Sequence, residues 1–197
     1  MAFDTDLYSL EWFRRRTKSP KGPHVSSGHL ADLVYAEFAP KRVIDLGSGT
    51  CAFANRMGEH GVDATAIDGS PTNAEFATHC RYFGRDLSQP LDLDEKFDLV
   101  TSWDVLEHIP AECEAVAVQN VINLASDWLL LSIDSSSWGH GHVNCKSKGY
   151  WRDVFTKAGL VWDKARTDDM QIKIRDNQKI TSNWYGYNLT VYRVGGV

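Results

Sequence analysis

Short apolar runs alternate with stretches of helical periodicity along most of this chain, and this alternation constrains the fold more than any other feature. Four runs are apolar enough to form strands of a sheet covered on both faces; they are residues 42–46, 64–67, 97–102 and 128–133. Apolar spacing predicts helices at about 29–38, 51–60, 73–81, 111–125 and 148–158. Repeated strand-helix-strand units of this kind predict an α/β fold with a doubly wound, Rossmann-like, mostly parallel sheet.

The residues after 159 follow a different pattern. Segments 160–166, 170–175 and 185–193 look like strands, because β-branched and aromatic residues recur in them. A polar turn containing Asp176 and Asn177 separates two of these segments. Since little chain remains for another helix, we expect an antiparallel C-terminal hairpin that completes a seven-stranded sheet.

The most loop-like part of the sequence is residues 17–28. Pro20, Gly22 and Pro23 are expected to interrupt any helix there, and Ser26 or Ser27 to cap the next one. With 197 residues, the chain has the length of one compact domain rather than two. We therefore predict a single domain.

Charge and cysteine usage argue against several classes of protein. The net charge of −5 disfavours sequence-independent binding to nucleic acid, which depends on clustered cations. One basic run is an exception to the acidic net charge. We interpret it mainly as a solvent-exposed face, with binding of a phosphate-bearing acceptor or of a partner protein as alternatives. It consists of Arg14, Arg15, Arg16, Lys18 and Lys21. The cysteines form no C-x-x-C pair, the segment 1–10 has no signal-peptide pattern, and no apolar run could span a membrane. We expect a cytoplasmic protein without a membrane association.

A glycine turn directly after the first predicted strand carries the strongest chemical signal. The strand ends at Asp45-Leu46 and runs through Gly47-Ser48-Gly49 into a helix. A side chain at Gly47 or Gly49 would block a ligand from the backbone amides at the helix start. The bare pattern also fits a dinucleotide site, but Asp45 would then face a pyrophosphate of like charge. A carboxylate at this position better suits the ammonium end of an amino-acid-bearing ligand.

A second carboxylate, Asp68, ends the next predicted strand and is followed by Gly69. At this distance from the glycine turn, a carboxylate can accept both hydroxyls of an adenosine ribose. The alternative is a structural role at the N-terminus of the following helix. A third block, Asp86-Leu87, precedes the polar turn at 88–90.

These blocks, with the segment 97–110 that follows them, resemble the class I S-adenosylmethionine-dependent methyltransferases. The resemblance covers residues 42–110 and departs modestly, because Cys51 stands where a third glycine is frequent. It implies that S-adenosyl-L-methionine is the cofactor. The residues it implies as cofactor-binding are Asp45, Gly47, Ser48, Gly49, Asp68, Gly69, Asp86, Leu87, Ser102 and Trp103. Residues 1–40 would then form a loop and helix over the active site, 41–110 the cofactor half and 111–197 the substrate-side half.

The segment 138–144, followed by Tyr150-Trp151, looks like a tail of small, substrate-unassigned members of the same family. His108, His140 and His142 follow predicted strands, so they should emerge at the ligand-binding edge of the sheet. We predict them as candidate catalytic residues, and Trp138, His140 and His142 as substrate-binding. A metal site formed by His140, His142 and Cys145 is conceivable, but no fourth ligand is evident and no metal is predicted.

The sequence thus predicts a methyltransferase that acts by in-line displacement, with a small-molecule acceptor favoured over nucleic acid. Because the sulfonium leaving group already activates the methyl, the reaction can proceed without a general base, and the sequence does not decide whether one is used. Two alternatives remain: a non-catalytic methyltransferase-like binding module, and an NAD-dependent oxidoreductase. The sequence gives no indication of the oligomeric state.

Overall fold

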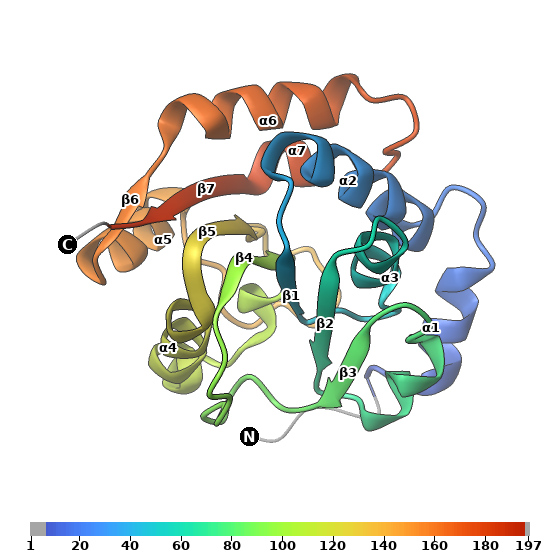
Figure 1. Ribbon diagram of the computed structural model, residues 1–197. Helices are drawn as coiled ribbons and strands as arrows, with labels where there is room; N and C mark the ends of the chain where they lie inside the picture. The colour runs from blue at the N-terminus through green and yellow to red at the C-terminus, as the bar shows by residue number, and fades with distance from the viewer. Residues whose placement is uncertain (1–6, 196–197) are drawn as a thin grey trace.

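A computed structural model describes residues 7–195, in which one mixed sheet has the strand order β3-β2-β1-β4-β5-β7-β6 (Figure 1). The strands are β1 (Arg42–Leu46), β2 (Asp63–Asp68), β3 (Arg81–Gly84), β4 (Phe97–Trp103), β5 (Ala125–Ser132), β6 (Leu160–Trp162) and β7 (Leu189–Val194). The first five run parallel, and β7 is antiparallel to both β5 and β6. The predicted seven-stranded α/β fold is confirmed.

Helices cover both faces of this sheet (Figure 1). They are α1 (Leu10–Thr17), α2 (Pro23–Phe38), α3 (Ala52–Glu59), α4 (Glu114–Leu124), α5 (Lys148–Lys157), α6 (Lys164–Asp176) and α7 (Tyr185–Asn188). Successive strand residues point to opposite faces, so each strand contributes to two cores. Val43, Leu99 and Leu130 pack with α2, α3 and α6, whereas their neighbours Ile44, Val100 and Leu129 pack with α4 and α5.

Two predicted elements in the middle of the chain are corrected by the structure. The expected helix at 73–81 is only a short 3-10 segment, η1 (Pro71–Phe76), and Arg81 begins strand β3. The alternating sequence Arg81-Tyr82-Phe83 favours a strand, and parallel pairing with β2 from Thr65↔Arg81 fixes it there. The prediction was wrong because helical spacing was read across this boundary.

The C-terminal region is partly as predicted. β6 and β7 pair antiparallel, but α6 and α7 lie between them in sequence, so no tight turn joins them. The segment 170–175, expected as a strand, belongs to α6. Met170 and Ile174 are four residues apart and both buried, which is the helical spacing, and the side chain of Asp163 caps the helix by accepting from Arg166 N.

The N-terminal region is more helical than predicted. Helix α1 was not expected, and α2 begins at Pro23 inside the stretch that was expected to be a loop. Gly22 occupies the N-cap position and Pro23 the first turn, where the missing N–H of proline has no cost. Of the loop and helix predicted for residues 1–40, residues 1–6 lie outside the described part of the chain. Among the helices of residues 7–195, none combines the length and the apolar character needed to cross a bilayer.

Candidate active site

A cavity of about 610 Å³ lies where the parallel strands end. Gly47, Gly69 and Asp104 line it, and each of them directly follows the last residue of a strand, β1, β2 and β4 respectively. Because β1, β2 and β4 are neighbours and run parallel, their carboxyl ends meet at one edge. The cavity therefore occupies the position at which open α/β sheets bind ligands.

The glycine turn after β1 is tied to the end of β2. The backbone amides of Gly47 and Ser48 donate to the carbonyl oxygen of Ile67, at 2.8 and 2.9 Å. Gly49 N donates to Asp68 Oδ2 at 2.8 Å, and Asp68 Oδ1 accepts from Ser70 N at 3.0 Å. Asp68 thus holds the loop together from both sides and also lines the cavity. A ribose-binding role and a structural role for Asp68 are therefore compatible with each other.

The three carboxyl groups predicted to bind the cofactor, those of Asp45, Asp68 and Asp86, all line this one cavity. Asp45 is buried and accepts a hydrogen bond from Thr101 Oγ1 at 2.8 Å. Burial raises the pKa of Asp45 to about 7, with a smaller contribution from the charge of Asp68. Burial likewise raises the pKa of Asp68 to about 6. Two buried carboxyls at one loop favour a ligand that brings hydroxyl groups or positive charge to them.

The raised pKa of Asp45 predicts a pH-dependent stability. The folded chain holds a proton that the unfolded chain releases, so this stabilisation is present below about pH 4 and is lost as pH rises through 7. Between pH 5 and pH 8, the free energy of unfolding of the cofactor-free protein should fall by about 2–3 kcal/mol more than that of the Asp45→Asn variant. Urea unfolding of both proteins at the two pH values measures this difference. Equal changes in the two proteins would show that Asp45 is ionised throughout.

The aromatic residues predicted for the site separate into two groups. Trp103 lines the cavity, with its ring 5.5 Å from that of Phe53 and 5.8 Å from that of Tyr185. Ser102 is buried and does not line the cavity, because successive residues of a strand point to opposite faces and Trp103 is the one that faces the cavity. Trp138 is 93% exposed and does not reach the cavity. Its sequence neighbours are serines and a glycine, which offer the indole no apolar surface, so the structure does not bring Trp138 to the cavity with the histidines.

All three predicted histidines line the cavity. His108 Nδ1 lies 2.9 Å from Tyr8 Oη and 3.0 Å from the carbonyl oxygen of Gly141. His142 Nδ1 lies 2.7 Å from the carbonyl oxygen of Ser136. His140 stacks on Trp12, with ring centroids 6.1 Å apart. Burial lowers the pKa of His108 to about 4, so this ring is neutral at ordinary pH.

The conceivable ligand set of His140, His142 and Cys145 does not assemble. Cys145 Sγ instead donates to the carbonyl oxygen of Ser136 at 3.2 Å. Among residues 7–195, the group that could hold a metal ion is Glu107, His108 and His142. Glu107 was missed by the sequence reasoning, as were Asp104 and Asp134, which line the cavity. Asp68 was predicted from its position at the end of a strand. The same criterion would have found Asp104 and Asp134, which follow the ends of β4 and β5.

The basic N-terminal run divides between the surface and the cavity. Arg14 forms a two-bond ion pair with Glu75, and Arg15 pairs with Glu11. Arg16 places its guanidinium 4.0 Å from the ring centre of Trp12 and lines the cavity. Burial lowers the pKa of Arg16. The run is therefore not one continuous patch of free cations.

A family model described as a methyltransferase domain matches residues 24–138, more than half of the chain. No curated protein matches the sequence. Several solved structures share the fold at low identity. The N-methyltransferase NodS from Bradyrhizobium japonicum WM9, in complex with S-adenosyl-L-homocysteine, is 15% identical with a TM-score of 0.63, over 96% of this chain and 99% of that one.

Two further structures have similar scores. Magnesium protoporphyrin IX methyltransferase from Synechocystis PCC 6803, with bound S-adenosylhomocysteine, is 19% identical, with a TM-score of 0.62 over 80% of this chain and 87% of that one. The 1,6-didemethyltoxoflavin-N1-methyltransferase from Burkholderia thailandensis is 15% identical, with a TM-score of 0.61 over 88% and 80%. At these identities the likeness shows the fold alone.

Proposed function

The chain belongs to the family of S-adenosylmethionine-dependent methyltransferase domains, and from this premise we propose that it methylates a small-molecule acceptor in the cavity at the carboxyl edge of the sheet. The observation that carries the proposal is the convergence of Asp45, Asp68 and Asp86 with the glycine turn on one cavity. A dinucleotide would bring two phosphates to the same carboxylates, which disfavours that alternative.

The residues at this edge fit the cofactor. Gly47 and Gly49 both have positive φ and place no side chain in the cavity, while the carboxylate of Asp68 is held in place by Gly49 N and Ser70 N. When bound, S-adenosylmethionine supplies a methyl group already activated by its sulfonium leaving group. We assign Asp68 with Gly69 to the ribose hydroxyls, and Asp86 with Leu87 to the adenine.

The methionine portion is assigned to Asp45 and the turn of Gly47, Ser48 and Gly49. Trp103, between Phe53 and Tyr185, is proposed to lie near the transferred methyl. Its rigid apolar surface would keep water from the reacting atoms. Holding two reactants in attack geometry can supply on the order of 7–11 kcal/mol of the barrier, so few dedicated catalytic side chains are needed.

The acceptor side is assigned to His108, His140 and His142, with Tyr8 and Trp12 of the N-terminal region closing over them. A cavity of about 610 Å³ is in the range of small-ligand sites. Arg16 has no carboxylate partner among residues 7–195 and lines the same space, which favours an acceptor that carries an anionic group. The 1,6-didemethyltoxoflavin-N1-methyltransferase, solved with bound 1,6-didemethyltoxoflavin, supports a small-molecule acceptor.

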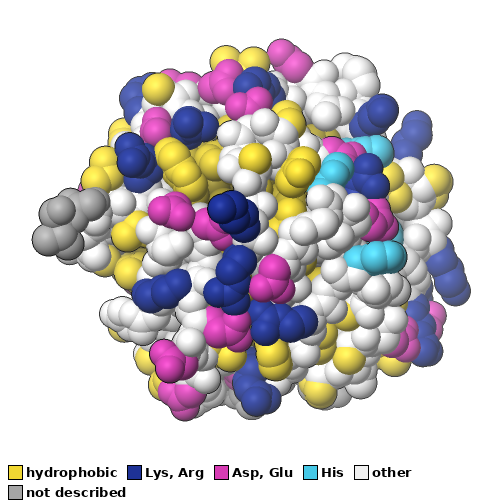
Figure 2. Space-filling model, viewed as in Figure 1, with side chains coloured by type: hydrophobic (Ala, Val, Ile, Leu, Met, Phe, Trp, Pro, Cys, Tyr) yellow, Lys and Arg dark blue, Asp and Glu magenta, His cyan; other side chains and the backbone are white. Residues whose placement is uncertain are grey.

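A nucleic-acid acceptor is less well supported. Arg14 and Arg15 are engaged in ion pairs, and basic and acidic side chains are interspersed on the face shown in Figure 2. A groove for a polyphosphate chain would need cationic side chains along its length, without acidic side chains between them.

We further propose that residues 1–197 act as one domain, with 41–110 as its cofactor half and 111–197 as its acceptor half.

Two experiments separate this proposal from its alternatives. Titration calorimetry should show binding of S-adenosylhomocysteine and none of NAD. The reverse result would overturn the proposal in favour of the NAD-dependent alternative. Incubation with methyl-labelled cofactor and separate small-molecule and macromolecular fractions of a cell extract should yield a labelled low-mass product. Cofactor binding without label transfer to any fraction, small or macromolecular, would instead identify a non-catalytic binding module.

A further inference from the structure

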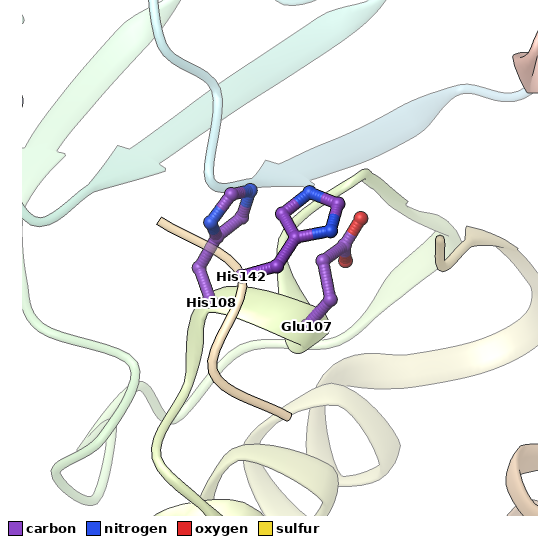
Figure 3. A group of neighbouring side chains, drawn as sticks. All are labelled: Glu107, His108 and His142. Atoms are coloured by element: carbon purple, nitrogen blue, oxygen red, sulfur yellow. The ribbon is translucent and has the colours of Figure 1, made fainter. Parts of the chain in front are cut away.

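Three side chains with metal-binding atoms lie close together (Figure 3). Two of them, His108 and His142, line the cavity. Glu107 and His108 belong to the short 3-10 segment η2 (Leu106–His108), just beyond β4. His142 comes from the loop between β5 and α5, and its ring centre is 4.7 Å from that of His108. One ligand atom from each residue lies within 4.8 Å of the others.

Backbone contacts hold these distant segments together. The carbonyl oxygen of Glu107 accepts hydrogen bonds from both Val143 N and Asn144 N, each at 2.9 Å. These bonds place His142 beside η2. A Cβ at Gly139 would lie 2.0 Å from the imidazole of His142, so the glycine allows this ring to lie flat against the chain. The arrangement of the three side chains is therefore built by the loop rather than by chance exposure.

Both imidazoles are oriented through Nδ1. His142 Nδ1 is 2.7 Å from the carbonyl oxygen of Ser136, and His108 Nδ1 is 3.0 Å from that of Gly141. Tyr8 Oη also lies 2.9 Å from His108 Nδ1, but this hydroxyl donates its hydrogen to the carbonyl oxygen of His140. Because a carbonyl oxygen only accepts, Nδ1 of each ring donates to its carbonyl, and Nε2 then keeps its lone pair. Metal-ligating histidines are commonly held in this way, with one ring nitrogen on a backbone carbonyl and the other on the ion.

The third side chain, Glu107, is completely buried. Its Oε1 accepts from Asp134 N at 3.0 Å, whereas Oε2 has no hydrogen-bond partner among the described residues. The carboxyl groups of Asp104 and Asp134 lie close enough to add negative charge around it. A buried carboxylate oxygen without a partner is costly, and a cation between it and the two imidazoles would satisfy it.

We propose that Glu107, His108 and His142 bind one divalent transition-metal ion, with zinc as the best-fitting example. Two imidazole nitrogens and one carboxylate oxygen are a ligand set of zinc and ferrous sites, whereas magnesium and calcium prefer oxygen alone. Ligands about 2 Å from zinc lie roughly 3.3 Å from one another, so binding would draw the three side chains inward. Since His108 and His142 line the cavity, the open coordination positions face it. On the proposed function, an acceptor oxygen or nitrogen would occupy one of them.

The test is metal binding by the folded, chelator-treated protein. Titration with Co²⁺ should produce visible absorption bands of a four- or five-coordinate site, saturating at one ion per chain, and Zn²⁺ should abolish them. Glu107→Gln and His142→Gln should each weaken Co²⁺ binding by ~100-fold or more. Gly139→Ala keeps all three ligands but displaces the His142 ring, and should weaken binding by roughly 10-fold.

Two control variants test the assignment of the ligands. His79→Gln removes an exposed histidine elsewhere on the surface, and His140→Gln removes the cavity histidine outside the cluster. Both should bind Co²⁺ as the unaltered chain does. Loss of binding in either control, or no binding by the unaltered chain, would overturn the proposal; in the latter case Glu107 is a protonated carboxyl that serves only the fold.

Circular dichroism and thermal unfolding establish that each variant is folded, and His142→Gln and Gly139→Ala keep the test valid if Glu107→Gln does not fold. S-adenosylhomocysteine binding is measured separately in the same samples. Metal binding without cofactor binding would contradict the proposed function alone. Cofactor binding without metal binding would contradict the metal site alone.

Discussion

Replacing Asp68 by alanine is expected to weaken S-adenosylhomocysteine binding by roughly 100- to 1000-fold, because two charge-assisted hydrogen bonds of about 1.5–2 kcal/mol each are lost. The assigned role of this carboxylate is to accept the ribose hydroxyls. It also accepts from Gly49 N and Ser70 N, so its removal leaves two loop amides without their partner. Titration calorimetry of the folded variant at pH 8, where the carboxyl is ionised, measures the loss.

Asp63→Asn is the matched control, since Asp63 lies at the other end of β2 with a half-exposed side chain. It should leave cofactor binding unchanged. Asp68→Asn keeps one acceptor oxygen and the shape of the side chain, and should show an intermediate loss of about 10-fold. If Asp68→Ala binds S-adenosylhomocysteine as tightly as the unaltered chain does, the ribose assignment is wrong.

Much of the cofactor side could be predicted from the sequence, because its signals are local. The apolar strand, the glycine turn and the carboxylate follow one another directly at 43–49, and Asp68 stands at the end of the next strand. Predicting a ligand site from residues that follow strands needs only the strand positions and the fact that the carboxyl ends of parallel strands share one edge of the sheet. No knowledge of long-range packing is required, so these residues were brought to one cavity as expected.

The elements that were wrongly predicted depend on contacts between distant residues. Segment 170–175 has β-branched residues that suit a strand, yet Met170 and Ile174 bury one face of α6 against the sheet. Tertiary packing outweighed local propensity there. The expected helix at 73–81 was ended in the same way, by pairing of Arg81 with β2.

The acceptor side shows the same limit. Glu107 joins His142 only because Val143 N and Asn144 N bond to the carbonyl oxygen of Glu107, and no sequence spacing encodes that contact. Trp138 stands two residues before His140 and was placed with it, but the chain turns at 138–141 and leaves the indole in solvent. Adjacency in sequence did not translate into adjacency in the cavity.

Gly47→Ala is expected to destabilise the protein by roughly 2–5 kcal/mol, the sum of about 1–2 for an alanine in a left-handed conformation and about 1–3 for overpacking. Gly47 has a φ of +76°, and a Cβ there would lie 2.3 Å from Val105 Cγ2 and 2.7 Å from Cγ1. Because the clash would push the turn away from β4, cofactor binding should fall as well. Urea unfolding gives the stability and calorimetry the affinity.

Gly61 separates the two causes of this loss. Its φ is +84°, but nothing lies within 4 Å of a Cβ at this position, so Gly61→Ala should cost only the conformational term of about 1–2 kcal/mol. Val105→Ala removes both methyl groups that a Cβ at position 47 would meet. In the double variant Gly47→Ala/Val105→Ala, we therefore expect a favourable coupling energy of about 1–3 kcal/mol. Strict additivity of the two substitutions would show that backbone strain alone, and not contact with Val105, requires glycine in the cofactor turn.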